Sequence, residues 1–423
     1  MEELTTVSIE DQIIDSFRAT SDFQKTSLAQ FKDLGIPLKK SEAYKFTPIK
    51  NILSKNFDWS ANSAFVLNID VKAHFYPIVK ANHLVFLNGT FDLEKSIVTS
   101  DTSELVISAI TEKDNLYNSL GIIADQKNDA FAAWNGAKTS IPLHIEVIKN
   151  TQNIPTFIYH FADSTSGESY SYPRIIVKSN SGSELSIYEK LIVSGDNNTF
   201  INSVIEAEVK DNASLKYTKT QNYPANVFAI EAIYGTQTSN SRFYTNTYSF
   251  SGSLIRNNIS LAIDGENCEG HMNGIYLLDN KSHVDNNTAV DHRAPNSYSN
   301  ELYKGVLKGH SKGVFNGKIY VRPIAQKTNA FQSNNNVLLS EFATINTKPQ
   351  LEIWADDVKC SHGCTVGQLD EDAIFYLRAR GISKEDAITL MLNAFTKDTL
   401  KEVNEEYVKN QVLDLIEKGL KNE

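Results

Sequence analysis

The segment DDVKCSHGCTVGQ, residues 356–368, places two cysteines and a histidine within five positions, at Cys360, His362 and Cys364. Thiolates and imidazoles are ligands that zinc and iron accept. If the segment is an extended strand, residues two apart leave the same face, so Cys360 and His362 would point the same way. Cys364 would join them unless the chain bends at Gly363. The set is too small for a closed site, so any cluster here would need ligands from another subunit.

Other interpretations of these residues stay open at this point. Cys360 could be a small buried hydrophobe and His362 a turn residue bonded to the backbone. The pair could also serve a thiol enzyme, with Cys360 as nucleophile and His362 as base, although no third orienting group or oxyanion donor is evident. A separate metal site would require other histidines to align as a ladder along a repeated fold, namely His271, His283, His292 and His310.

The overall composition excludes several classes of protein. The 423 residues carry a net charge of −10 without a basic run, which argues against nucleic-acid binding. Three cysteines are too few for a disulfide scaffold. The N-terminal segment is acidic where a secretory signal is basic, and no window approaches the roughly 18 apolar residues of a membrane span. We therefore expect a cytoplasmic protein with no nucleic-acid or membrane partner.

The candidate ligands end a long stretch of short alternating segments that begins near residue 142. Segments such as LHIEVIKN and KGVFNGKIYV are rich in β-branched and aromatic residues and are bounded by Gly, Asn, Ser or Asp. No amphipathic helix interrupts them, which disfavours the α/β classes and leaves a sandwich, a barrel or a solenoid.

Recurring asparagines favour the solenoid among these three folds. They lie at what we interpret as strand turns, where stacked amides can bond to one another along a coiled sheet. We therefore expect a β-helix-like solenoid in which each coil contacts its neighbours. The asparagines are Asn257, Asn258, Asn286, Asn287, Asn316, Asn334, Asn335 and Asn336.

Helical patterns precede this β stretch. Residues 1 to about 58 have apolar positions near helical spacing, and Gly35 with Pro37 ends one of the helices. Residues 60–140 give a mixed signal with one clear strand, HLVFLNGTFD, in which Asn88 and Gly89 mark a tight turn.

Helical patterns return after residue 367. Gly381 ends one helix and Ser383 begins the next. A last helix carries an apolar stripe of Val408, Val412, Leu415, Ile416 and Leu420. We expect three parts: an N-terminal helical and mixed region (1–140), a β core (141–366) and a C-terminal helical domain (367–423). The terminal helices either cap exposed strand edges or dock a partner.

Three stretches resemble the SufB/SufD family of iron–sulfur cluster assembly proteins. The most specific is LEIWADDVKCSHGCTVGQLDEDAIFYLRARGIS, residues 351–383, and residues 309–340 are similar to the last β coils of the family. SEAYKFTPI, residues 41–49, resembles its N-terminal motif, with Tyr44 where the family usually has Trp. Gly363 follows the histidine where SufB members have Glu, and FQSNNNVLLSEFATINT lacks the cysteines of SufB. The resemblance is therefore to the SufD members.

The resemblance implies a right-handed parallel β-helix core flanked by helices and a non-catalytic scaffold role. It also implies a complex with a SufB-type paralogue, joined through the last coils, and with a SufC-type ATPase bound by the C-terminal helical domain. His362 corresponds to a functional histidine at that interface and Cys360 to its neighbouring cysteine, so both become ligands of a transient cluster or iron. Cys364 stands where the family more often has Ala, and it is an extra ligand, a redox partner of Cys360 or a neutral small residue. We favour the last of these.

Two further observations bear on function. The segment GHSKGVFNGKIY lacks the spacing of a phosphate-binding loop, so any ATP would be hydrolysed by another protein. Solenoids of this kind also host carbohydrate-active sites, which keeps a carbohydrate-active β-helix protein as an alternative, and a homodimer is a possible state of the isolated chain.

Overall fold

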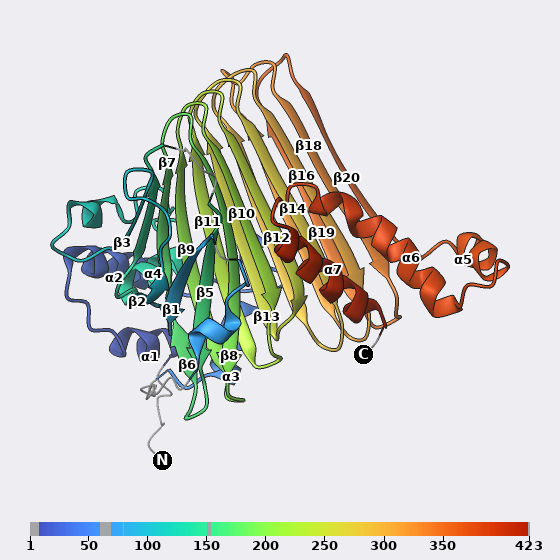
Figure 1. The fold of residues 1–423 in the computed structure, drawn as a ribbon, viewed down its shortest axis with the longest axis horizontal. Coiled ribbons are helices and arrows are strands. Elements are labelled where there is room, and N and C mark those ends of the chain that lie inside the picture. Colours follow the sequence, from blue (N-terminus) through green and yellow to red (C-terminus); the bar gives the residue numbers. More distant parts are fainter. Residues whose placement is uncertain (1–7, 60–68, 79, 150–153, 422–423) are drawn as a thin grey trace.

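The computed structural model describes residues 8–59, 69–78, 80–149 and 154–421, and the expected mainly β fold with helical flanks is confirmed (Figure 1). The helices are α1 (Ile9–Asp15), α2 (Asp22–Leu34), α3 (Ile49–Asn56), α4 (Ala130–Lys138), α5 (Glu371–Arg378), α6 (Lys384–Thr396) and α7 (Glu406–Lys421), with short 3₁₀ turns η1 (Glu42–Tyr44), η2 (Val71–His74), η3 (Asn115–Ser119) and η4 (Lys397–Leu400). No helix of this described part is long and apolar enough to cross a membrane.

The strands form two sheets. The β20 sheet has the order β2 (Thr90–Ile97), β1 (Asn82–Leu87), β5 (Thr156–Asp163), β8 (Glu184–Ser194), β10 (Ser214–Asn222), β12 (Arg242–Ser251), β14 (Glu269–Leu278), β16 (Tyr298–Leu307), β18 (Asn329–Leu338), β20 (Lys359–Gly367). The β19 sheet has the order β19 (Thr344–Ile353), β17 (Lys312–Val321), β15 (His283–His292), β13 (Leu254–Ile263), β11 (Val227–Gln237), β9 (Thr199–Val209), β7 (Arg174–Ser179), β4 (Leu143–Val147), β3 (Leu105–Ala109), and β6 (Ser169–Ser171) pairs with β9.

The two sheets are the walls of a parallel solenoid of about eight coils. From β8 to β20 the long strands alternate between the sheets, and each pairs in parallel with the strand one coil away. In the β19 sheet, Leu254, His283 and Lys312 occupy successive coils at the same register. Because strand side chains alternate between the two faces, every second residue points into the space between the sheets, where Ile233, Leu261 and others form the apolar core.

Asparagine ladders do stack along the coils, as expected, but their position was predicted wrongly. Asn257 donates to Asn286 at 2.9 Å and Asn316 donates to Asn287 at 3.1 Å, and all four lie inside strands rather than at turns. A different set of asparagines occupies the turns with positive φ, namely Asn212, Asn240, Asn267, Asn280 and Asn296. Asparagine tolerates this left-handed conformation better than most residues, so these positions mark the coil repeat.

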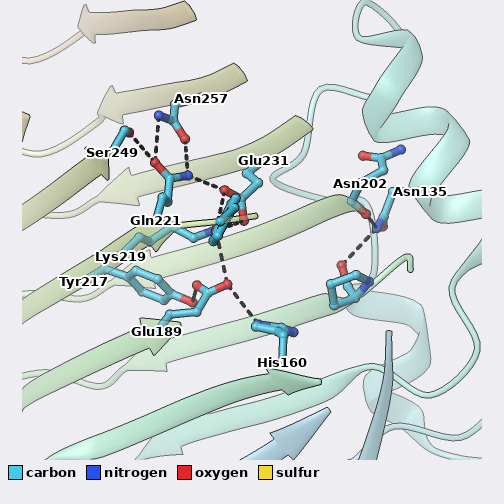
Figure 2. A network of polar contacts seen from close by, with 12 residues as sticks. Asn135, His160, Glu189, Asn202, Tyr217, Lys219, Gln221, Glu231, Ser249 and Asn257 are labelled. Atoms are coloured by element: carbon cyan, nitrogen blue, oxygen red, sulfur yellow. Dashed lines mark hydrogen bonds and ion pairs between the residues drawn. The ribbon is translucent and has the colours of Figure 1, made fainter. Parts of the chain in front are cut away.

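Charged side chains are also buried between the sheets (Figure 2). Lys219 Nζ lies 3.2 Å from Glu189 Oε1 and 3.0 Å from Glu231 Oε1, and His160 Nε2 lies 2.9 Å from Glu189. Tyr217 donates to Glu189 at 2.5 Å. Burial opposes ionisation of Glu189, but Lys219 and His160 outweigh it and hold the pKa of this carboxyl at about 2. The same two glutamates raise the pKa of Lys219 against the effect of burial, so the cluster is ionic.

The N-terminal segment packs against the outer face of the β19 sheet. The Arg256 guanidinium lies 3.9 Å from the ring centre of Tyr44 and pairs with Asp285, which also accepts from Thr47. The helix signals in this region are confirmed, since Gly35 ends α2 with a φ of 61°. Asn88 and Gly89, both with positive φ, form the tight turn between β1 and β2.

The C-terminal helices lie on the outer face of the β20 sheet, so the expectation that they cap strand edges is wrong for the described residues (Figure 1). Val408, Val412 and Ile416 of α7 are buried in a cluster with Tyr248 and Ile275 of the sheet, and the side chain of Leu420 lies outside the described residues. Lys304 of β16 donates to Phe395 O, and Ser383 caps α6 as expected. The helix α5 packs on α6 and extends away from the sheets.

Candidate functional site

The segment that carries the candidate ligands is the last strand of the β20 sheet. Strand β20 pairs with β18 on one side, and β19 pairs with β17 on one side. Within the part of the chain that the structure describes, nothing pairs with the other edge of either strand. The solenoid is therefore open at this end and presents unpaired backbone N–H and C=O groups, which favour pairing with another chain.

Strand β20 brings Cys360, His362 and Cys364 onto one face. Its register runs without a shift through Gly363, so the bend considered there is absent. Ala330, Gln332 and Asn334 are their partners on β18, and all three are buried between the sheets. Partners in a parallel ladder share a face, so the two cysteines and the histidine lie on the inner face of the sheet, at its uncovered end.

The three side chains differ in exposure. His362 and Cys364 are exposed because no further coil covers them, whereas Cys360 is half-buried beside Ala330 and Val358. Burial raises the pKa of the Cys360 thiol. A raised pKa disfavours the thiolate, so this thiol lacks the electropositive surroundings of an activated nucleophile.

No group of three or more His, Cys, Asp or Glu side chains in the described residues could hold a metal ion. The histidine ladder considered from the sequence is wrong, since none of its members is a register neighbour of another. His271 stacks on Tyr244, and His310 stacks on Phe342. His283 is half-buried and His292 is buried, and loss of hydration lowers the pKa of their rings to about 3 and about 4 respectively.

Large apolar side chains surround the open end, and motif reasoning did not single them out. The last-coil apolar residues are Phe342, Ile353, Trp354 and Val366, with exposed fractions of 64%, 39%, 49% and 48%. Large exposed apolar side chains beside unpaired strand edges are typical of a protein interface. Their sequence positions share no pattern, since Ile353 ends β19, Trp354 follows it, Phe342 lies in the turn before β19 and Val366 lies within β20.

We expect iodoacetamide to modify the three cysteines in an order set by their exposure. Cys364 should react first, Cys360 more slowly because of its burial and raised pKa, and Cys268, which is buried, only on unfolding. Mass spectrometry of peptides from timed samples at pH 8 measures the three rates. Faster reaction at Cys360 than at Cys364 would contradict this reading and favour the thiol-enzyme alternative.

Together, the fold and the site define a parallel β-solenoid whose last coil is uncovered and carries two cysteines and a histidine on its inner face. Residues 160–395 match the family described as SUF system FeS cluster assembly, SufBD core domain. The chain belongs to this SufBD family.

Individual relatives match over most of the chain. The Escherichia coli iron–sulfur cluster assembly protein SufD is 28% identical over 391 residues, 91% of this chain and 90% of the relative. An iron–sulfur cluster assembly SufBD family protein of Synechocystis is 29% identical, covering 88% of this chain and 84% of the relative. The protein ABCI7, chloroplastic, of Arabidopsis thaliana is 30% identical, covering 91% of this chain and 82% of the relative.

Proposed function

We propose that this chain is a non-catalytic scaffold subunit of a cytoplasmic iron–sulfur cluster assembly complex. Its open solenoid end pairs with a SufB-type paralogue, and Cys360 and His362 supply ligands to the nascent cluster or its iron. The observation that carries the proposal is that these two side chains lie together on the inner face of β20, a strand with one unpaired edge. Two ligands make up only part of a cluster-binding site, so the cluster is a transient substrate held jointly with the partner.

A SufC-type ATPase is the second proposed partner, bound by the C-terminal helical domain. The exposed apolar side chains of α5, Phe375 and Tyr376, support docking of a partner there. Since α6 and α7 pack on the β20 sheet, movement of the ATPase would be transmitted to the core. In the proposed division of the chain, with boundaries at residues 140 and 366, the β core (141–366) holds the site. The C-terminal helical domain (367–423) receives this movement.

Replacement of His362 by alanine tests the proposed site. In the complex with the SufB-type and SufC-type partners, reconstituted without oxygen, we expect His362→Ala to lose most of the visible absorbance of the cluster while the complex still assembles. His74→Ala is a matched control, because His74 is also exposed but lies in η2 beside β5, far from β20 in the order of the sheet. Equal cluster loading in His362→Ala and the unmodified chain would contradict the proposed role.

A further inference from the structure

A row of buried amides lies on the inner face of β18, in register with the candidate ligands of β20. Two of these amides have both N–H groups occupied. Asn334 donates to Tyr276 Oη at 2.8 Å and to Tyr303 O at 3.3 Å, and Asn336 donates to Asn334 at 2.8 Å and to Thr365 O at 3.2 Å. They are structural groups that stabilise the last two coils.

Gln332 differs from these two asparagines. It is 1% exposed, and its Nε2 donates to Glu301 Oε2 at 3.1 Å, but its Oε1 has no hydrogen-bond partner. A buried carbonyl oxygen without a partner costs free energy and calls for an explanation. Gln332 is also the direct register partner of His362.

Two neighbours fix the orientation of the Gln332 amide. Glu301, its register partner on β16, accepts from Nε2 and also from the hydroxyl of Thr288. On the facing strand β17, Gly317 leaves the space that the amide fills, since a Cβ at that position would overlap Gln332 Nε2. The amide is therefore held with its N–H toward Glu301.

An amide whose N–H points to the preceding coil can turn its carbonyl oxygen toward the following coil. In a planar amide the carbonyl oxygen and the nitrogen point in different directions, so an amide in a ladder along a parallel sheet can donate to one coil and accept from the other. Asn316 of the same molecule likewise donates to Asn287 on the preceding coil, and its own Oδ1 has no hydrogen-bond partner. For Gln332 the following coil is β20, about 4.8 Å away, and the residue there is His362.

We propose that Gln332 is a positioning residue for His362: its side-chain carbonyl accepts a ring N–H of His362 and so leaves the other ring nitrogen free to bind iron. Glu301 acts behind it by fixing the amide. A histidine ligand commonly donates its second ring N–H to an oxygen acceptor, and loss of that acceptor typically weakens metal binding about 10–100-fold. This inference rests on the proposed function, because it needs His362 to be a ligand.

Cobalt(II) binding to the complex with the SufB-type partner tests the inference. The visible absorption of cobalt reports its ligand geometry, and a titration gives its Kd. We expect Gln332→Met to raise the Kd about 10–100-fold and to alter the spectrum. Gln332→Glu keeps an acceptor oxygen and should restore the Kd to within a few-fold of the unmodified value. Ser333→Ala, on the same strand but the opposite face, is the matched control and should bind normally.

The outcomes separate this inference from the proposed function. If His362→Ala binds cobalt as tightly as the unmodified complex, the proposed ligand is wrong. If His362→Ala is weak while Gln332→Met binds normally, His362 remains a ligand and the positioning role of Gln332 is overturned. If Gln332→Met and Gln332→Glu are equally weak, loss of packing rather than loss of an acceptor explains the effect, which also overturns the inference. Thermal unfolding of each variant is compared in parallel.

Discussion

Replacing Lys219 by methionine is expected to lower the free energy of unfolding by about 3–5 kcal/mol, because removal of one partner from a buried ionic cluster leaves the others uncompensated. Lys219 is 2% exposed and lies between the carboxylates of Glu189 and Glu231 (Figure 2). Without the ammonium group, two buried negative charges would face each other. Urea unfolding followed by circular dichroism measures the change.

Two controls make this result specific. The triple variant Lys219→Met, Glu189→Gln and Glu231→Gln removes all three charges, so most of the lost stability should return. Lys25→Met removes the exposed pair of Lys25 with Asp22, whose atoms are 3.4 Å apart, and should change stability by less than about 1 kcal/mol. An unchanged midpoint for Lys219→Met alone would contradict the ionic cluster.

The pH dependence of this cluster follows from the lowered pKa of Glu189, at about 2. A carboxyl whose pKa is lowered by folding stabilises the folded state above its ordinary pKa, which is about 4.3. That contribution is lost as the pH falls toward 2. In the triple variant this part of the acid sensitivity should be absent.

Replacing Glu301 by glutamine is expected to stabilise the protein at pH 8 by up to about 3 kcal/mol, and to have little effect below about pH 4.5. Burial raises the pKa of Glu301 to about 7, with Thr288 and Gln332 opposing the shift. Among the described residues no basic side chain forms an ion pair with Glu301, so ionisation leaves a buried, uncompensated charge. Tyr303 is the titratable neighbour, and burial raises the pKa of its hydroxyl well above the usual range.

The sign of the effect follows from proton binding. Because the folded state holds the proton on Glu301 more tightly than the unfolded state, stability falls as the pH rises from about 4.5 through about 7. Glutamine is neutral throughout and keeps an oxygen for Thr288 and Gln332. Urea unfolding at pH 5 and pH 8 checks the expectation, and an equal stability difference at both values would contradict it.

The solenoid was predictable because the sequence patterns that indicate it are local. Alternating segments with short polar turns identify strands without intervening helices, and amide stacking needs only the coil repeat. The turn positions were missed although Asn212, Asn240, Asn267 and Asn296 recur about once per coil, because each is a single asparagine among many others in the sequence. Asn257 and Asn286 lie in strands, yet they are the same residue type as the turn asparagines.

The buried charges were not predictable from the alternating pattern. In SLKYTKTQN, both Lys216 and Lys219 look like solvent-facing residues, but Lys219 points into the core, where Glu189 and Glu231 from other coils neutralise it. That pairing depends on which coils become neighbours, which no local segment encodes. The position of the C-terminal helices on a sheet face was missed for the same reason.

The site itself was partly visible in the sequence. The spacing of Cys360 and His362 placed both on one face of a strand, as the structure has them. The proposed roles of Gln332 and Glu301 in positioning His362 were not visible, because both residues lie on preceding coils. They are recognised only from the register between β16, β18 and β20. Such partners carry no motif of their own, so only the three-dimensional arrangement identifies them.

Hydrogen exchange at β20 tests most directly whether the open end is completed by a second chain. The amides of residues 359–367 that face the unpaired edge should exchange quickly in the isolated protein. When the SufB-type partner is added, we expect their exchange to slow by at least about tenfold. A complex that forms while exchange in residues 359–367 stays unchanged would contradict the account.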